Sequence, residues 1–263
     1  QNLILLLLLL LVFSISCNPE ITERKNESIK VIKEKEPEVD SVQIAFELWK
    51  KNYISDFNVT EKLIEFGENN LENKVVIYTN YGKMKFKLYK ETPLHRANFI
   101  MLSKKRIYDK TLFYRVIKNF MIQGGNSDDS EISEKMNKLG SYKIPNEINL
   151  KYPHKMGALA MAVSHDNQER GKESSSINFY VVQGQKLPRS YLDELKKSGT
   201  ELTEKSYNIY LKKGGAAHLD GKYTVFGELI SGFSVLSKIS NVRTSKYNWP
   251  KKRIIIDSII AYN

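Results

Sequence analysis

Cysteine is almost missing from this sequence, which has 263 residues and a single cysteine, Cys17. One cysteine excludes an intrachain disulfide and does not by itself assign a redox compartment. Metal-ligand spacing is also missing, because no cysteine pair accompanies the four histidines, His95, His154, His165 and His218. The serines lack the context of a catalytic nucleophile, and the double glycines lack the lysine and helix of a phosphate-binding loop. The sequence therefore predicts neither a metal nor an organic cofactor, and it argues against hydrolase and nucleotide-binding functions.

Long apolar runs are missing as well, since none reaches the ~20 residues that a membrane-spanning helix needs. Residues 3–13 are apolar throughout and have the length of the apolar core of a signal peptide. Small residues precede Cys17, an arrangement that resembles the lipobox of bacterial lipoproteins, although Ser14 stands where leucine is usual. We expect residues 1–17 to be a signal peptide that ends at a lipidated Cys17; a plain signal peptide or an uncleaved anchor remains an alternative.

A lipid anchor at Cys17 would place the protein in a bacterial cell envelope, attached to a membrane and facing the periplasm or the cell surface. The sequence starts without a methionine or a basic segment. We therefore expect its natural start to lie further upstream.

Acidic residues are in short supply: 30 of them face 41 lysines and arginines, so the formal net charge is +11 and the isoelectric point is near 9.4. Such a surplus raises nucleic acid or an anionic membrane as partners. The lysines are spread along the chain, however, and no nucleic-acid-binding motif accompanies them. We expect a solvated basic surface and no nucleic acid partner. The hydrophobic fraction of 41% is sufficient for a folded core.

The residue pattern divides the chain into four segments, the first of which is the expected signal peptide. Residues 18–40 are charged and poor in large apolar side chains, which predicts a flexible tether. Residues 41–73 carry helical spacing and predict a helical extension, whose second helix should begin at the N-cap Thr60 and end at Gly67. From residue 74 the pattern changes to the alternation of β-strands, and we expect one domain to span residues 74–263.

A helical insertion is expected inside this domain, at about residues 185–213. Residues 190–197 and 203–213 have helical patterns, with Thr203 as a capping residue and Gly214 as a helix end. Two interpretations of the insertion stay open: decoration of the surface, or contact with a specific partner.

Residues 113–125, FYRVIKNFMIQGG, are the most informative part of the sequence. They predict two short strands that are joined at Lys118 and Asn119. In strict alternation Arg115 shares a face with Phe113 and Ile117, which is unusual for a charge if that face is buried. One interpretation is a buried hairpin in which the arginine is merely paired.

The spacing F-x-R-x(4)-F-M-x-Q-G-G resembles the signature of the cyclophilins, a family of peptidyl-prolyl cis-trans isomerases. Residues 157–162 (GALAMA), 178–180 (NFY) and 219–227 (LDGKYTVFG) support the resemblance, which runs from about residue 74 to the C-terminus. It implies a mainly β fold: a closed eight-stranded antiparallel cyclophilin-like β-barrel that is capped by two helices. The N-terminal helical extension and the helical insertion would be additions to that fold.

The resemblance also implies a site. Arg115 takes the position of the family's catalytic arginine, whose N–H groups would stabilise the twisted transition state through the prolyl nitrogen. Phe120, Met121, Tyr180 and Leu219 would hold the proline ring, with Met161 and Phe179 behind or beside them. The other substrate-binding positions would hold the peptide or form the rim of the groove: Gln123, Ala162, Val163, Asn178, His218 and Tyr223.

Five positions differ from the best-known members of the family. Tyr114 stands where histidine is common, and Asn178 is one methylene shorter than the usual glutamine, so we expect it to need a bridging water. In addition, Tyr180 replaces a phenylalanine, Val163 an asparagine, and His218 a tryptophan of the cyclosporin-sensitive members.

We expect a monomeric peptidyl-prolyl isomerase that acts on proline-containing segments of unfolded or envelope proteins. The main alternative is a weakly active or inactive cyclophilin-like binding or chaperone module anchored to the membrane. A third possibility is a structural envelope protein in which the tether and the basic surface matter more than the groove.

Overall fold

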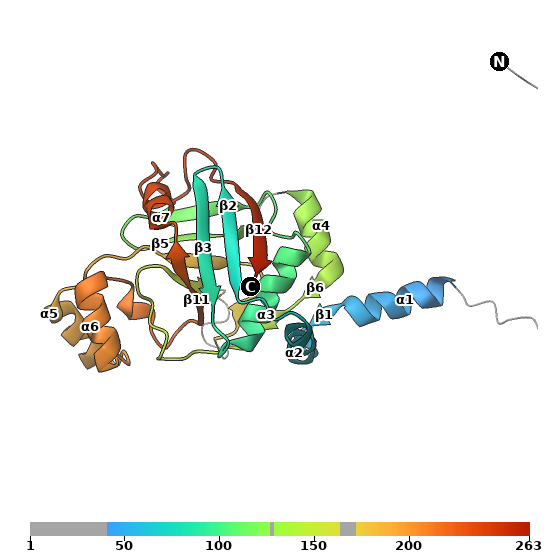
Figure 1. The fold of residues 1–263 in the computed structure, drawn as a ribbon, viewed down its shortest axis with the longest axis horizontal. Coiled ribbons are helices and arrows are strands. Elements are labelled where there is room, and N and C mark those ends of the chain that lie inside the picture. The colour runs from blue at the N-terminus through green and yellow to red at the C-terminus, as the bar shows by residue number, and fades with distance from the viewer. Residues whose placement is uncertain (1–40, 127–128, 164–171) are drawn as a thin grey trace, which may run out of the picture. The chain divides into compact units, whose positions relative to one another are not determined.

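The structure, a computed structural model, describes residues 41–126, 129–163 and 172–263 (Figure 1). The expected signal peptide with Cys17 and the expected tether lie outside these residues, as does His165. The chain divides after Ile44, and the architecture is that of Ala45–Asn263. Within the described ranges no helix is both long and apolar enough to cross a membrane.

Eight strands form one antiparallel sheet in the order β12-β2-β3-β11-β8-β10-β5-β4. Figure 1 shows β12, β2 and β3 running beside one another. The strands are β2 (Lys74–Thr79), β3 (Gly82–Leu88), β4 (Leu112–Ile117), β5 (Met121–Asn126), β8 (Ala158–Met161), β10 (Phe179–Val182), β11 (Val225–Ser231) and β12 (Ile256–Tyr262).

The sheet is open and curled, so the expectation of a closed barrel has to be corrected. Among the described residues, the outer strands β12 and β4 share no ladder: one bridge, Leu112 to Ile255, and the main-chain hydrogen bonds around it join the start of β4 to the start of β12. The chain between α7 and β12 explains the gap, because it covers the free edge of β4: the Val116 amide donates to the Asn248 carbonyl oxygen at 2.9 Å. A loop in that position satisfies the edge without a paired strand.

Two helices pack on the sheet and complete its core. They are α3 (Pro93–Lys104), which lies against β12, and α7 (Phe233–Ser240), which lies against β3, β4 and β5. The centre of the core is aromatic: Phe99 and Phe179 meet edge to face with ring centroids 5.2 Å apart, and Phe113 approaches Phe179 at 5.8 Å. Such pairs contribute about 0.5–1.5 kcal/mol each beyond the area they bury.

A β-bulge in β4 decides which way Arg115 points. Phe113 lies opposite Gly124 and Arg115 lies opposite Gln123, so Tyr114 is an extra residue without a partner in the ladder. An extra residue breaks the alternation of side chains. Phe113 is therefore buried and Arg115 is exposed. The expectation that both share one face was wrong, because strict alternation holds only in a regular strand.

The N-terminal helices are confirmed, whereas the ends predicted for the second one were wrong. α1 (Ser41–Asn52) is followed by α2 (Val59–Asn69), which begins after Asn58 and continues past Gly67. Gly67 lies inside α2 and allows a close approach to α3, since a Cβ there would lie 3.3 Å from the Cβ of Ala97, a tight contact.

Short elements connect these parts. β1 (Ile54–Ser55) pairs in parallel with β6 (Gly140–Ser141), which follows α4 (Ser130–Leu139), and β7 (Lys143–Ile144) pairs with β9 (Ser174–Ser175).

The insertion is helical, as predicted. It contains α5 (Arg189–Lys197) and α6 (Glu204–Lys213), and the 3₁₀ helix η2 (Ala217–Leu219) follows. The Thr203 side chain caps α6 by accepting a hydrogen bond from the Ser206 amide at 3.1 Å, and Gly214 ends that helix. Leu192 of α5 and Tyr210 of α6 lie in one small buried cluster, and Figure 1 shows both helices outside the sheet.

Candidate active site

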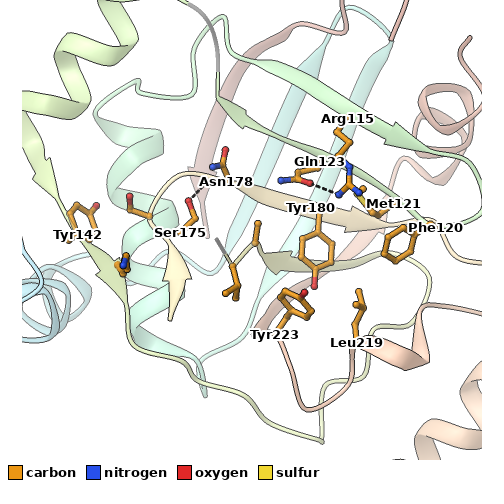
Figure 2. Close-up of a pocket in the computed structure, with 14 residues that line it drawn as sticks. Arg115, Phe120, Met121, Gln123, Tyr142, Ser175, Asn178, Tyr180, Leu219 and Tyr223 are labelled. Atoms are coloured by element: carbon orange, nitrogen blue, oxygen red, sulfur yellow. Dashed lines mark hydrogen bonds between the residues drawn. The ribbon is translucent and has the colours of Figure 1, made fainter. Parts of the chain in front are cut away.

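A groove of about 640 Å³ lies over strands β4, β5 and β10, and ten of the thirteen residues expected at the site line it (Figure 2). These ten are Arg115, Phe120, Met121, Gln123, Ala162, Val163, Asn178, Tyr180, Leu219 and Tyr223. They come from four separate parts of the chain, so the fold has brought together what the sequence shows only as scattered segments.

The apolar part of the groove is a pocket around Tyr180. In Figure 2 the Tyr180 ring points toward Tyr223, with Phe120 and Leu219 to one side and Met121 next to Phe120. The rings of Tyr180 and Tyr223 meet edge to face, 6.1 Å apart. Tyr180 and Met121 are buried, and Phe120 is half-buried, so the pocket can take a compact apolar group from solvent.

Arg115 stands at the edge of this pocket, on the exposed side of β4. Its Nη1 donates to Gln123 Oε1 at 3.2 Å, which holds the guanidinium beside Met121 and Phe120 in Figure 2. A guanidinium carries five N–H donors and stays charged at every relevant pH. Arg115 therefore supplies donors and a positive charge at the mouth of an apolar pocket.

A chain of hydrogen bonds continues from Arg115 through Tyr114 to the opposite wall. Gln123 Nε2 donates to the Tyr114 hydroxyl at 2.7 Å, and that hydroxyl donates to Asn178 Oδ1 at 3.1 Å. Burial raises the pKa of Tyr114, so its hydroxyl keeps its proton at neutral pH and remains a donor. Because its Oδ1 is occupied, Asn178 can offer its Nδ2 amide to a bound peptide.

Asn178 is held by a side chain of β4, and the expected water bridge between Asn178 and a bound peptide stays a prediction. Asn178 and Gln123 are both held by the hydroxyl of Tyr114, the residue that the bulge inserts into β4. Tyr114 and Asn178, which replace a histidine and a glutamine of the best-known family members, are therefore joined by one hydrogen bond.

Beneath the pocket, the Tyr180 hydroxyl lies 3.0 Å from His154 Nε2, and His154 Nδ1 lies 2.8 Å from Asp220 Oδ1. Tyr210 of the insertion donates its hydroxyl to the other Asp220 oxygen at 2.7 Å. All four side chains are buried, and burial raises the pKa of Tyr180 well above its usual value. A carboxylate only accepts, so Nδ1 carries a proton, and in the neutral ring Nε2 accepts from Tyr180. The insertion is therefore tied to the pocket floor.

Three expected residues do not line the groove. Met161 and Phe179 are fully buried in the core, so they lie behind the groove, one of the two placements expected for them, and do not line it. His218 lies beside the groove and packs on Phe120 with ring centroids 5.2 Å apart. Burial lowers the pKa of His218, and the imidazole is therefore neutral at pH 7.

Sequence reasoning missed four residues that line the other end of the groove: Tyr142, Lys143, Ser175 and Ser176. Ser175 has a clear role there, because its Oγ accepts a hydrogen bond from the main-chain amide of Asn178 at 3.0 Å. This bond stabilises the turn that leads into Asn178. No motif surrounds Tyr142 and Lys143. The run of three serines at 174–176 was a visible signal, although nothing in the sequence connects it with the groove.

A serine, a histidine and a glutamate are linked elsewhere, but not as an active site. His95 Nε2 lies 2.9 Å from Ser174 Oγ, and His95 Nδ1 lies 2.6 Å from Glu147 Oε2. His95 and Ser174 are fully buried, so no substrate can reach the hydroxyl. Glu147 also accepts the Leu94 and His95 amides at the start of α3, which makes this a structural cluster.

Known proteins resemble the chain over the same region. A family model described as cyclophilin type peptidyl-prolyl cis-trans isomerase/CLD matches residues 74–261. A putative peptidyl-prolyl cis-trans isomerase of Staphylococcus epidermidis is 34% identical over 189 residues, which are 72% of this chain and 91% of that protein. A putative bifunctional phosphatase/peptidyl-prolyl cis-trans isomerase of Streptococcus pyogenes is 31% identical over 80% of this chain and 44% of its own length.

A solved structure agrees with this match. The cyclophilin type peptidyl-prolyl cis-trans isomerase of Cryptosporidium parvum, crystallised in the presence of the dipeptide Ala-Pro, covers 72% of this chain and 99% of its own. Its TM-score is 0.50 at 25% sequence identity.

Proposed function

The chain belongs to the cyclophilin-type peptidyl-prolyl cis-trans isomerase family, and we propose that it accelerates rotation about X-Pro bonds through Arg115. The observation that carries the proposal is the position of Arg115, a permanent charge with N–H donors at the mouth of an apolar pocket. Proline-containing peptides are the substrates of this proposal, consistent with the Ala-Pro dipeptide named for the Cryptosporidium parvum structure.

The chemistry follows from the electronic structure of the peptide bond. Rotation costs about 18–20 kcal/mol because the nitrogen lone pair is delocalised into the carbonyl group. In the twisted transition state the lone pair is localised on the prolyl nitrogen, which becomes a hydrogen-bond acceptor. A donor aimed at that nitrogen therefore binds the transition state more tightly than the planar ground state.

The rest of the groove would hold the two sides of the bond. The pocket around Tyr180 would hold the proline ring, so that the carbonyl group of the preceding residue can rotate about its bond to the prolyl nitrogen. Gln123 and Asn178, both oriented by Tyr114, would hold main-chain groups of the peptide. Holding both sides of the X-Pro bond in position lowers the entropic part of the barrier to its rotation.

The direct test of this function is the rate of cis-trans isomerisation of a short peptide that contains one X-Pro bond. The wild-type chain should exceed the uncatalysed rate, and Arg115→Ala should lose most of that excess. A wild-type rate equal to the uncatalysed rate would contradict the proposed activity and favour the alternative of a binding module.

The Tyr114→Phe variant should lower kcat/KM by about three- to tenfold. It removes the hydroxyl that orients Gln123 and Asn178. The expected loss corresponds to the net value of one hydrogen bond, about 0.5–1.5 kcal/mol, because both residues keep their main-chain positions. Tyr78→Phe, at an exposed tyrosine of β2, is the matched control and should leave the rate unchanged. Equal rates for wild type and Tyr114→Phe would show that the hydroxyl does not position the groove.

We also propose that the protein is lipid-anchored in a bacterial envelope through Cys17 and acts there on proline-containing segments of envelope proteins. The support is the small-residue pattern before the single cysteine, after a run of apolar residues. In cells fed a labelled fatty acid, the wild-type chain should become labelled and Cys17→Ala should not. Labelling of Cys17→Ala at the wild-type level would contradict the anchor.

A further inference from the structure

A second hollow of about 640 Å³ lies between the insertion and the sheet, and it shares no lining residue with the groove. Its walls come from the end of β3 and the turn after it, from residues 151–155, and from helix α6. We call this hollow the basic cleft, because its lining includes the lysines Lys87, Lys90, Lys151, Lys155 and Lys205.

The charges of the basic cleft do not balance. Two glutamates line it beside the five lysines, which leaves a surplus of three positive charges. Lys151 pairs with Glu91 at 2.8 Å, and Lys155 pairs with Glu228 at 2.6 Å. The described part of the chain provides no ion pair for the other three, Lys87, Lys90 and Lys205, and all three are exposed. Their charges are therefore available to an incoming anion.

The basic cleft also has an apolar side that suits a polypeptide better than a small ion. Tyr89 and Tyr152 stack face to face with ring centroids 3.8 Å apart, and Ile209 of α6 lines the same hollow. Stacked rings and an aliphatic side chain can cover the apolar parts of an extended peptide. Lysines at the edge of such a surface select acidic side chains by charge complementarity.

We propose that the basic cleft binds an acidic segment of a client polypeptide, outside the groove in which its proline is isomerised. That this polypeptide is also a substrate rests on the proposed function, whereas binding at the basic cleft does not require turnover. The insertion then contributes to recognition, because α6 provides Lys205 and Ile209.

The two sites are close enough for one chain to occupy both. Tyr152, Pro153 and Lys155 line the basic cleft, while His154 among them reaches Tyr180 of the groove. An extended chain spans about 3.3–3.6 Å per residue, so a short linker can connect a bound acidic segment to a proline in the groove. A segment held at the cleft raises the local concentration of that proline.

Binding is measured with the Arg115→Ala chain, so that turnover does not contribute, and with a peptide that has no proline for the groove to hold. A fluorescein-labelled peptide rich in glutamate and free of proline is titrated with this protein at low salt, and fluorescence anisotropy is followed. The same peptide with glutamine in place of glutamate should bind at least tenfold more weakly. Added salt should reduce the difference because it screens the charges.

A triple substitution tests the location. Lys87→Gln, Lys90→Gln and Lys205→Gln together should raise the dissociation constant of the glutamate peptide about tenfold. The control triple, Lys238→Gln, Lys251→Gln and Lys252→Gln, changes net charge equally at exposed positions outside the basic cleft and should leave the constant unchanged. Thermal unfolding followed by circular dichroism checks that both triples are folded.

Three results would overturn the proposal. The first is equal binding of the glutamate peptide by the two triple variants, and the second is equal binding of the glutamate and glutamine peptides. The third is that the triple variant of Lys87, Lys90 and Lys205 binds anionic phospholipid vesicles more weakly than wild type while it binds the glutamate peptide unchanged. The first would mean that only the overall charge of the protein matters, the second that the charge of the peptide does not contribute to binding, and the third would assign the lysines to a membrane surface. None of these results depends on isomerase activity, so failure of this proposal is distinct from failure of the proposed function.

Discussion

The Arg115→Ala variant is expected to lose roughly ten- to 150-fold in kcat/KM toward a short X-Pro peptide. A hydrogen bond from a charged donor is worth about 1.5–3 kcal/mol net, which converts to that range of rates. The prolyl nitrogen accepts this bond only when the peptide bond is twisted, so the loss should appear in kcat while KM changes little. The remaining acceleration would come from the grip of the pocket around Tyr180.

The measurement is peptide isomerisation followed at several substrate concentrations. Arg115→Lys keeps the charge but not the planar fork of donors, and its rate should lie between those of wild type and Arg115→Ala. Arg243→Ala, at an exposed arginine outside the groove, is the matched control and should behave as wild type. If Arg115→Ala kept the wild-type kcat, or lost activity only through KM, Arg115 would be a binding residue and not the catalytic donor.

Gly125→Ala should lower the free energy of unfolding by about 3 kcal/mol or more. Gly125 has φ +106°, and a Cβ there would lie 2.2 Å from the main-chain oxygen of Ile177. A strained backbone angle costs about 1–3 kcal/mol, and forcing atoms into a packed site costs a similar amount again. The clash would also push Ile177 and thus Asn178, so the wall of the groove should move.

Gly199→Ala separates the two costs of that substitution. Gly199 has φ +91°, but a Cβ there would meet no atom within 4 Å. Its loss should therefore be limited to the strain, about 1–2 kcal/mol. Urea denaturation of both variants gives the comparison. Equal losses would mean that the backbone near Ile177 moves aside at no cost and that Gly125 is required only for its dihedral angle.

The hairpin motif made much of the site predictable, because its residues are close in sequence. Phe120, Met121 and Gln123 are near Arg115 along the chain, and two paired strands bring them together without help from the rest of the fold. The helices of the insertion were predictable for the same reason: the cap Thr203 and the stop Gly214 act on their own helix.

The hydrogen bonds around the groove were not predictable in this way. Asn178 and Tyr114 are 64 residues apart in the sequence. Few sequence patterns could link an asparagine to a particular tyrosine over that separation. The floor of the pocket depends in the same way on His154, Asp220 and Tyr210, which come from separate loops and from the insertion. Polar side chains of this kind have no periodicity, so only the folded chain shows their partners.

The sequence by itself determined the family resemblance, the position of Arg115 in the motif and the order of strands and helices, because these depend on local pattern. Tertiary structure decided that the sheet stays open and that Tyr114 is the extra residue of a bulge. A bulge depends on how two strands pair, and the pattern of one strand does not contain the register of its neighbour. That pairing turns Arg115 away from the core and toward the groove.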